Sequence, residues 1–348
     1  WQDYRSGNWD IYSKNLSTNK VLAVCTAEQD QTSPAVYGSI VVWEDYRNGN
    51  WDIYGKDLSK MEENEKTDEE NKDFAVCTLQ GDQTAPAIYG DIVVWQDSWN
   101  GNSDIYAKNL STNEDFAVCT LQGDQTAPAI YGDIVVWQDS WNGNSDIYAK
   151  NLSTNEEFAV CTAERDQYSP AIFGDIVVWQ DSWNGNSDIY GKNLSTGEEF
   201  VACKAPEGVS SPAVSGNIVV CQVWHYDEES GYNSNIYGRN LTADLTYEEF
   251  TVCTAEGNQY SPAVFGDIVV WTDLRNDWDN PDIYGKNLLT GEEFAVCTAE
   301  GRQEWPAIFG DIVVWQDYRS GNWDNCDIYA KNLLTGEEFA VCTAEGWQ

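Results

Sequence analysis

Histidine is almost absent from this sequence, because His225 is the only one among 348 residues. A single histidine excludes most catalytic triads and general-base arrangements, which usually depend on that side chain. Long apolar runs are missing too. No stretch approaches the roughly 18 residues that cross a bilayer, so no membrane insertion is expected. No CxxC pair and no Cys/His cluster occurs, which argues against a zinc or haem site.

Basic residues are scarce, with 19 Lys and Arg against 58 Asp and Glu, and the formal net charge is −39. Such a field repels phosphate backbones and anionic lipid surfaces, so nucleic acid is not expected as a partner. It attracts cations, Ca²⁺ above all. The alternative is that the acidity serves solubility alone.

Repetition is the dominant feature of the sequence. A unit of about 42 residues occurs eight times, at approximately 1–28, 29–80, 81–122, 123–164, 165–206, 207–256, 257–300 and 301–348. The segment that ends in cysteine occurs eight times and the proline-led start seven times, so the first copy lacks its opening part. Repeats of this length are typical of arrays and propellers.

Each unit divides into four short strands. In the copy that contains Pro170, these are PAIFG, IVVWQD, DIYGKNL and EEFVACKA, with an Asn-Gly hairpin signal between the second and third. No helical period occurs. The sequence therefore predicts an all-β protein, one β-propeller domain over 1–348 with four-stranded antiparallel blades. Eight blades are expected, the first incomplete, with seven as the alternative.

The recurring segments DIVVWQD, NGNSDIY and KNLSTGEEF resemble the TolB-like propeller repeats of archaeal, especially methanogen-type, cell-surface and S-layer proteins. The resemblance covers essentially the whole chain. It implies an extracellular or cell-surface propeller, and it supplies no general catalytic residue. The cysteine in every fourth strand departs from that pattern, where Val, Thr or another small residue is expected.

The loop between the second and third strands repeats the pattern D-x-x-x-G-N-x-D. Oxygen ligands at such spacing suit Ca²⁺, whereas Asn-Gly and Asp also simply make tight turns. Both interpretations stand, and no cofactor is required by either the fold or the turns. The candidate metal ligands are Asp97, Asn102, Asp104, Asp139, Asn144, Asp146, Asp181, Asn186 and Asp188.

Tryptophans recur in the same loops. Beside Asn and Asp they have the chemistry of sugar binding, but they could instead pack between blades or cover the hairpin. The candidate ligand-binding residues are Trp9, Trp51, Trp99, Trp141, Trp183 and Trp323.

Glycosylation sequons recur at one position on the opposite rim, and exposed turns of this kind fit a glycosylated surface protein. The acceptors are Asn15, Asn109, Asn151, Asn193 and Asn240, whereas Asn287 and Asn332 lack the hydroxyl residue.

Eight of the ten cysteines occupy one equivalent position per unit, so we expect them to lie too far apart for disulfides and to be small buried hydrophobes. Cys221, where other units have Trp, and Cys326 are the exceptions. Either could bridge to a repeat cysteine, and the sequence assigns no partner.

Near-identical repeats contrast with an active site, which needs unique residues. We therefore predict a non-enzymatic extracellular structural protein, a glycosylated building block of a surface layer, sheath or fibre, whose partner is itself. The alternative is a carbohydrate-binding or adhesion module that uses the Trp/Asp/Asn face, with glycans as partners. A hydrolase-like propeller enzyme ranks third.

Overall fold

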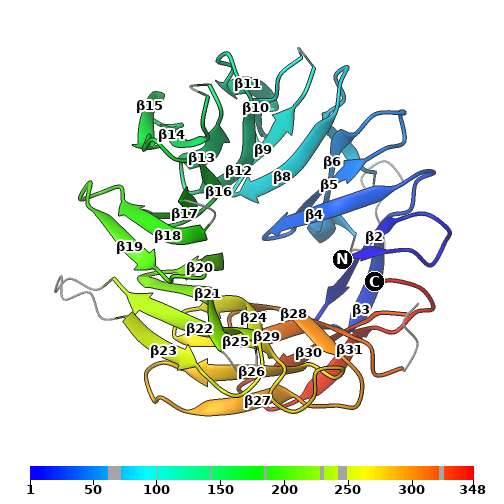
Figure 1. Ribbon diagram of the computed structural model, residues 1–348. Coiled ribbons are helices and arrows are strands. Elements are labelled where there is room, and N and C mark those ends of the chain that lie inside the picture. Colours follow the sequence, from blue (N-terminus) through cyan, green and yellow to red (C-terminus); the bar gives the residue numbers. More distant parts are fainter. Residues whose placement is uncertain are drawn as a thin grey trace. The chain divides into compact units, whose positions relative to one another are not determined.

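The computed structural model shows an all-β chain, an eight-bladed propeller of four-stranded antiparallel sheets in which the first sheet has three strands. It describes residues 1–61, 72–99, 101–141, 143–183, 186–227, 231–241, 249–320 and 325–348. The chain divides into two compact units, Trp1–Glu164 and Arg165–Gln348, and each is described by itself (Figure 1). The only described helix is the 3-10 turn η1 (Leu58–Lys60).

Unit 1 contains blades 1 to 4. Blade 1 consists of β1 (Gln2–Asp3), β2 (Asp10–Asn15) and β3 (Lys20–Cys25), and blade 2 of β4 (Gln31–Tyr37), β5 (Ile40–Asp45), β6 (Asp52–Asp57) and β7 (Phe74–Cys77). Blade 3 consists of β8 (Gln83–Tyr89), β9 (Ile92–Asp97), β10 (Asp104–Asn109) and β11 (Glu114–Cys119). Blade 4 consists of β12 (Gln125–Tyr131), β13 (Ile134–Asp139), β14 (Asp146–Asn151) and β15 (Glu156–Cys161).

Unit 2 contains blades 5 to 8. Blade 5 consists of β16 (Gln167–Phe173), β17 (Ile176–Trp183), β18 (Asn186–Asn193) and β19 (Glu199–Cys203), and blade 6 of β20 (Val209–Ser215), β21 (Ile218–Asp227), β22 (Gly231–Asn240) and β23 (Glu249–Cys253). Blade 7 consists of β24 (Gln259–Phe265), β25 (Ile268–Asp273), β26 (Asp282–Asn287) and β27 (Glu293–Cys297). Blade 8 consists of β28 (Gln303–Phe309), β29 (Ile312–Asp317), β30 (Asp327–Asn332) and β31 (Glu338–Cys342).

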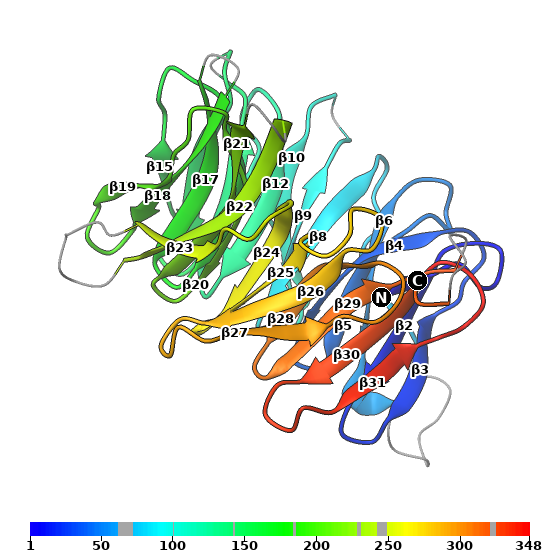
Figure 2. The same cartoon turned by 60° about the horizontal axis from the view of Figure 1, so that its bottom comes forward.

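The second strand of each four-stranded blade is largely buried, which explains its near-continuous run of apolar residues. Figure 2 shows successive blades of each unit stacked face to face. In the layer between blades 2 and 3, Cys77 of β7 lies in one hydrophobic cluster with Trp95 of β9. The same cysteine–tryptophan pairing recurs in other layers. Six of the eight repeat cysteines are buried free thiols, as predicted, whereas Cys161 is half-buried and Cys203 forms a disulfide, which that prediction did not include.

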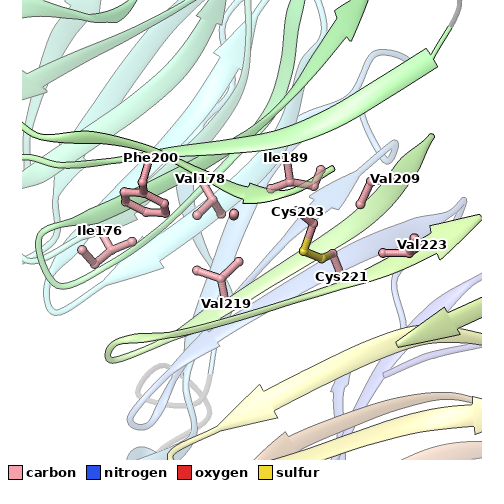
Figure 3. Close-up of a cluster of buried hydrophobic side chains, with 10 residues drawn as sticks. Ile176, Val178, Ile189, Phe200, Cys203, Val209, Val219, Cys221 and Val223 are labelled. Atoms are coloured by element: carbon pink, nitrogen blue, oxygen red, sulfur yellow. A yellow bond between two sulfur atoms is a disulfide. The ribbon is translucent and has the colours of Figure 1, made fainter. Parts of the chain in front are cut away.

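Blade 6 breaks this pairing, because Cys221 stands where the other blades have Trp. Figure 3 shows Cys221 of β21 bonded to Cys203 of β19 within the hydrophobic cluster between blades 5 and 6. One of the two exceptional cysteines thus does bridge to a repeat cysteine. The other, Cys326, is buried with a free thiol.

The first strand of each complete blade contains a bulge directly before its proline. In blade 3 the register between β8 and β9 shifts between Thr84 and Ala87, and Ala85 has a φ of 52°. Ala127 in blade 4 has a φ of 50°. These strands begin three residues earlier than the proline-led segments of the sequence indicate. The bulge interrupts the alternation of apolar and polar residues, so the residues before the proline do not show a strand pattern.

Candidate functional site

Two aspartates face each other in the loop region at the end of the second strand and the start of the third. In blade 3, Asp97 of β9 and Asp104 of β10 are register partners, so their side chains lie on the same face of the sheet. Both are buried. Equivalent pairs occur in every blade except blade 6, where Val223 faces Asn235.

The asparagine of this loop links the pair to the connection that leads to the next blade. The Asn102 amide donates to Asp104 Oδ1 at 2.9 Å and to the carbonyls of Leu121 and Gly123 at 3.3 and 2.8 Å. Asn144 donates to Asp146 at 2.9 Å and to the Ala163 carbonyl at 3.0 Å. These are the bonds of a tight turn.

The metal interpretation of the loops stays a prediction. No group of three or more His, Cys, Asp and Glu side chains within the described residues is arranged to hold a metal ion. In blade 5, Asp181 and Asp188 pair with arginine and lysine side chains, and Asn186 donates to the Pro206 carbonyl. In blade 4, Asp139 and Asp146 form the same opposed pair as in blade 3.

Four blades neutralise the first aspartate with an arginine two residues later, an arrangement that we call the guanidinium cluster. In blade 2, Arg47 donates to Asp45 through Nε at 2.8 Å and Nη2 at 2.6 Å. Its guanidinium also lies 4.0 Å from the Tyr54 ring centroid and 3.0 Å from Cys25 Sγ. The equivalent arginines of blades 1, 7 and 8 are Arg5, Arg275 and Arg319.

Blade 3 has Trp99 where blade 2 has Arg47, and no cation pairs with Asp97 or Asp104 in the described part of the chain. Burial raises the pKa of Asp97, although the backbone N–H of Trp99 donates to it at 3.0 Å. Burial also raises the pKa of Asp104, and repulsion by Asp97 adds to the effect. The role of these arginines was not predicted from the sequence, although the units differ visibly there: some have Asp-Tyr-Arg and others Asp-Ser-Trp.

The candidate tryptophans differ in exposure between the blades that have the loop arginine and the blades that lack it. Trp99 and Trp141 are 53% and 55% exposed. Trp9 and Trp51 are half-buried and pack on Tyr4 and Tyr46, with ring centroids 5.2 and 5.1 Å apart. The side chain of Trp183 and all of Trp323 lie outside the described residues. Sugar binding by these residues stays a prediction.

The candidate glycosylation sites lie at the ends of the third strands. The side-chain oxygens of Asn15, Asn109, Asn151 and Asn193 accept from the following turn, whereas the turn after Asn240 lies outside the described residues. Asn109 Oδ1 accepts from the N–H groups of Ser111 and Thr112 at 2.9 and 3.1 Å. Asn287, which is not a sequon, makes the same bonds at 2.9 and 3.1 Å. The turn therefore explains the recurring asparagine by itself. Glycosylation of Asn15, Asn109, Asn151, Asn193 and Asn240 stays a prediction.

A buried glutamine at the start of the first strand is a further member of the site that the sequence analysis missed. Gln83 is the register partner of Asp97 and is fully buried. Its Nε2 donates to the Gly81 carbonyl at 3.1 Å, while its Oε1 has no partner among the described residues. It recurs as Gln31, Gln125, Gln167, Gln259 and Gln303, a constancy within the repeats that could have revealed it.

The arrangement defines a class of protein, a repeat β-propeller whose loops carry buried carboxylates and exposed tryptophans. No protein-family model matches the sequence, and no curated protein matches it. None of the described helices has the length and apolar character of a membrane span.

Solved structures share the fold at low sequence identity. The β-propeller domain of the Trilobed protease from Pyrococcus furiosus aligns with a TM-score of 0.58 and 14% identity, over 90% of this chain and 98% of that one. A prolyl endopeptidase aligns with a TM-score of 0.64 and 10% identity, over 89% of this chain and 49% of the other. A puromycin-hydrolyzing peptidase from Mycobacterium tuberculosis aligns with a TM-score of 0.60 and 11% identity, over 91% and 54%.

These comparisons correct two predictions. The non-enzymatic interpretation, and with it the structural building block of a surface layer, sheath or fibre, is wrong, because the chain has the fold of propellers that belong to peptidases. The hydrolase-like propeller, ranked third from the sequence, agrees with the fold of these neighbours and stays a proposal for this chain. TolB from Acinetobacter baumannii is also among the similar structures, with a TM-score of 0.43 and 14% identity over 77% of this chain. These comparisons give no evidence for an archaeal surface-layer protein.

Proposed function

We propose that this chain is the propeller part of a peptidase-type hydrolase. The observation that carries the proposal is the match to the Trilobed protease propeller, which covers 90% of this chain and 98% of that domain. The prolyl endopeptidase and the puromycin-hydrolyzing peptidase support it through the same fold. The chain spans about half the length of those two enzymes.

The propeller's part in such a hydrolase is to bind and orient substrate. His225 lies on β21 opposite Asn233 of β22, and no hydrogen bond joins it to a serine, cysteine or carboxylate in the described part of the chain. The histidine chemistry of most amide-hydrolysing triads is therefore not assembled within these residues. In this proposal the reacting groups come from another part of the hydrolase.

The substrate class that the propeller suits best is a cationic peptide. A net charge of −39 raises the local concentration of positively charged ligands. Exposed Trp99 and Trp141 add aromatic faces on which peptide side chains can pack.

The test uses the native protein, captured from its source with antibodies raised against this propeller. We expect it to cleave a pool of synthetic peptides, with cleavage detected by mass spectrometry, and to prefer peptides rich in Lys and Arg. Antibodies already saturated with the recombinant propeller provide the control. Captured protein that cleaves no peptide of the pool would overturn the proposal.

An extracellular location, glycosylation and self-association are independent proposals that the same material can test. Glycopeptide mapping of the captured protein would show whether Asn109 or Asn151 carries a glycan. Sedimentation of the purified protein over a range of concentrations would show whether it associates with itself.

A further inference from the structure

Blade 3 preserves the surroundings of the guanidinium cluster but lacks the guanidinium. In blade 2 the group of Arg47 contacts one tyrosine ring, one thiol and two carboxylates. The residues that correspond to Tyr54, Cys25, Asp45 and Asp73 are Tyr106, Cys77, Asp97 and Asp115, respectively. At the position of Arg47 itself stands Trp99, with more than half of its side chain in solvent.

The structure has a cavity at this place. It measures about 360 Å³, and its lining includes Cys77, Trp95, Tyr106 and Asp115. Cys77, Tyr106 and Asp115 correspond to residues that the Arg47 guanidinium contacts in blade 2, and Trp95 corresponds to Trp43, which donates to Asp45. The cavity thus occupies the position that an arginine side chain fills in the neighbouring blade.

The clearest difference between the two blades is at Asp115, which has one ion-pair partner fewer among the described residues than Asp73 of blade 2. In blade 2, Asp73 pairs with Lys56 at 3.2 Å through Oδ1 and with Arg47 at 3.0 Å through Oδ2, and its side chain is 16% exposed. In blade 3, Asp115 keeps the lysine, Lys108, at 3.1 Å through Oδ1. Within the described residues no second cation pairs with Asp115, and its side chain is 61% exposed.

The indole of Trp95 makes a weaker contact with its aspartate than its counterpart in blade 2 does. Trp43 Nε1 in blade 2 donates to Asp45 Oδ2 at 3.0 Å, and that oxygen also accepts from the Arg47 guanidinium. Trp95 is buried, and its Nε1 forms no hydrogen bond of regular geometry with the described residues, although it lies close enough to Asp97 to lower the pKa of that carboxyl. In blade 2, Asp45 Oδ2 thus joins the Trp43 indole to the Arg47 guanidinium, and the described part of blade 3 has no guanidinium at this place.

Other blades show that this position takes a guanidinium from more than one place in the sequence. Blades 1, 2, 7 and 8 supply it from the loop after the second strand. In blade 5, which has the Ser-Trp loop of blade 3, Arg165 instead approaches from the segment before β16 and pairs with Asp181 at 3.1 Å. In blade 5 the aspartate therefore forms an ion pair with an arginine although the loop after the second strand does not contain one.

We propose that the cavity of blade 3 binds the guanidinium group of an arginine side chain that comes from outside this chain. Asp115 Oδ2 would accept from its N–H groups, and the Tyr106 ring would stack on its plane. Asp97 is not part of the lining and would contribute as a nearby negative charge. A flat guanidinium with several fixed donors suits a carboxylate and a ring better than a compact ammonium does. The proposal does not depend on the proposed hydrolase function, because it concerns binding alone.

The test measures binding of Nα-acetyl-arginine amide to the purified chain by NMR titration. We expect saturable binding of the arginine compound, weaker binding of the lysine analogue and none of the citrulline analogue, which has the same shape without the charge. Blade 4 shares the Ser-Trp loop, so all variants carry W141R, which supplies an internal guanidinium there.

Two variants and one matched control assign the binding to blade 3. W99R places an arginine where blade 2 has one and should abolish binding. D115N should weaken binding by about tenfold or more, because a hydrogen bond between charged groups is lost. The control D73N changes the equivalent residue of blade 2, whose cavity is already filled, and should change the affinity less than about twofold.

Thermal unfolding of each variant establishes that it is folded, and W99R gives a result independent of D115N. Undiminished binding by W99R, equal losses in D73N and D115N, or equal binding of the citrulline compound would each overturn the proposal. Equal binding of the lysine compound would overturn its guanidinium specificity.

Discussion

At the scale of single residues, the same pair of aspartates has opposite energetic roles in different blades. In blade 2, Arg47 compensates Asp45, so the pair Asp45–Asp52 contains one ion pair. In blade 3, Asp97 and Asp104 are buried together with no cation on either in the described structure. Two like charges in a partly desolvated place cost free energy, which a ligand cation would recover.

We predict that D104N stabilises the protein at neutral pH. The asparagine keeps an oxygen for the 2.9 Å bond from Asn102 and removes the repulsion of Asp97. The gain in unfolding free energy should be on the order of 1 kcal/mol, measured by urea denaturation. The control D52N should gain less. Burial and Asp45 also raise the pKa of Asp52, but its two oxygens accept from the Asn48 and Asn50 amides and an asparagine keeps only one such acceptor.

The pH dependence of D104N follows from the sign of the shift. Burial raises the pKa of Asp104 above its ordinary value of 3.8, so the wild-type protein loses stability as pH rises through that value toward the folded-state pKa. Below about pH 3.8 the carboxyl is protonated in both states and the gain should vanish. A gain that is the same at pH 3 and pH 7 would contradict the explanation by charge.

At the scale of elements, the bulge before the first-strand proline places a residue with a side chain in left-handed backbone. Ala127 has a φ of 50° at the bulge of β12, while Ala129 pairs regularly with Val136 of β13. An alanine in that conformation costs roughly 1 kcal/mol, which glycine avoids.

We predict that A127G stabilises the protein by about 0.5 kcal/mol, whereas A129G, two residues along the same strand, destabilises it by a similar amount. Urea denaturation of both variants makes the comparison. Destabilisation by both would show that glycine's entropy in the unfolded chain outweighs the relief of strain at the bulge.

The disulfide between β19 and β21 is the other device at this scale. Cys221 replaces the tryptophan that meets the repeat cysteine in other layers, so two thiols come together only there among the described layers. The bridge closes a short loop, since the two cysteines are 18 positions apart in the sequence.

We expect mild reduction of the disulfide to lower the unfolding free energy by about 2–3 kcal/mol. Thermal unfolding with and without a reductant measures this loss. The variant C221W should make the protein insensitive to the reductant and restore part of the lost stability, because Trp is the partner of the cysteine elsewhere. C221S should be insensitive to reductant but remain less stable. A C221S variant as stable as the oxidised protein would rule out a stabilising role for the bridge.

At the scale of the whole molecule, the repeats made the fold predictable and the site only partly so. Seven segments similar to IVVWQD and eight similar to DIYGKN, with Asn-Gly between them in four units, leave few alternatives to a propeller blade. The repeats do not predict where the side chains of Trp99 and Arg47 point. Trp99 is exposed, whereas Arg47, at the equivalent position, turns back to the carboxylate of Asp45. The partner of Cys221 depends on how blades stack, which sequence spacing does not contain.

The net charge of −39 also acts at this scale, because it is spread over blades whose arginines neutralise only some of the carboxylates. Mutual repulsion disfavours the compact state, and salt screens it over about 10 Å at 0.1 M ionic strength. We predict that the thermal midpoint rises between 0.02 and 1 M NaCl by about 5 °C, as expected for a gain of roughly 2 kcal/mol.

Divalent cations distinguish screening from a bound ion. If the loops that contain Asp97, Asn102 and Asp104 are turns alone, CaCl₂ and MgCl₂ at equal ionic strength should raise the midpoint equally. A calcium-specific rise that saturates at micromolar concentration, and that D104N removes, would instead show that these loops hold Ca²⁺. The same variant thus separates a carboxylate that only repels its neighbour from one that ligates a metal, since the first gains stability on neutralisation and the second loses it.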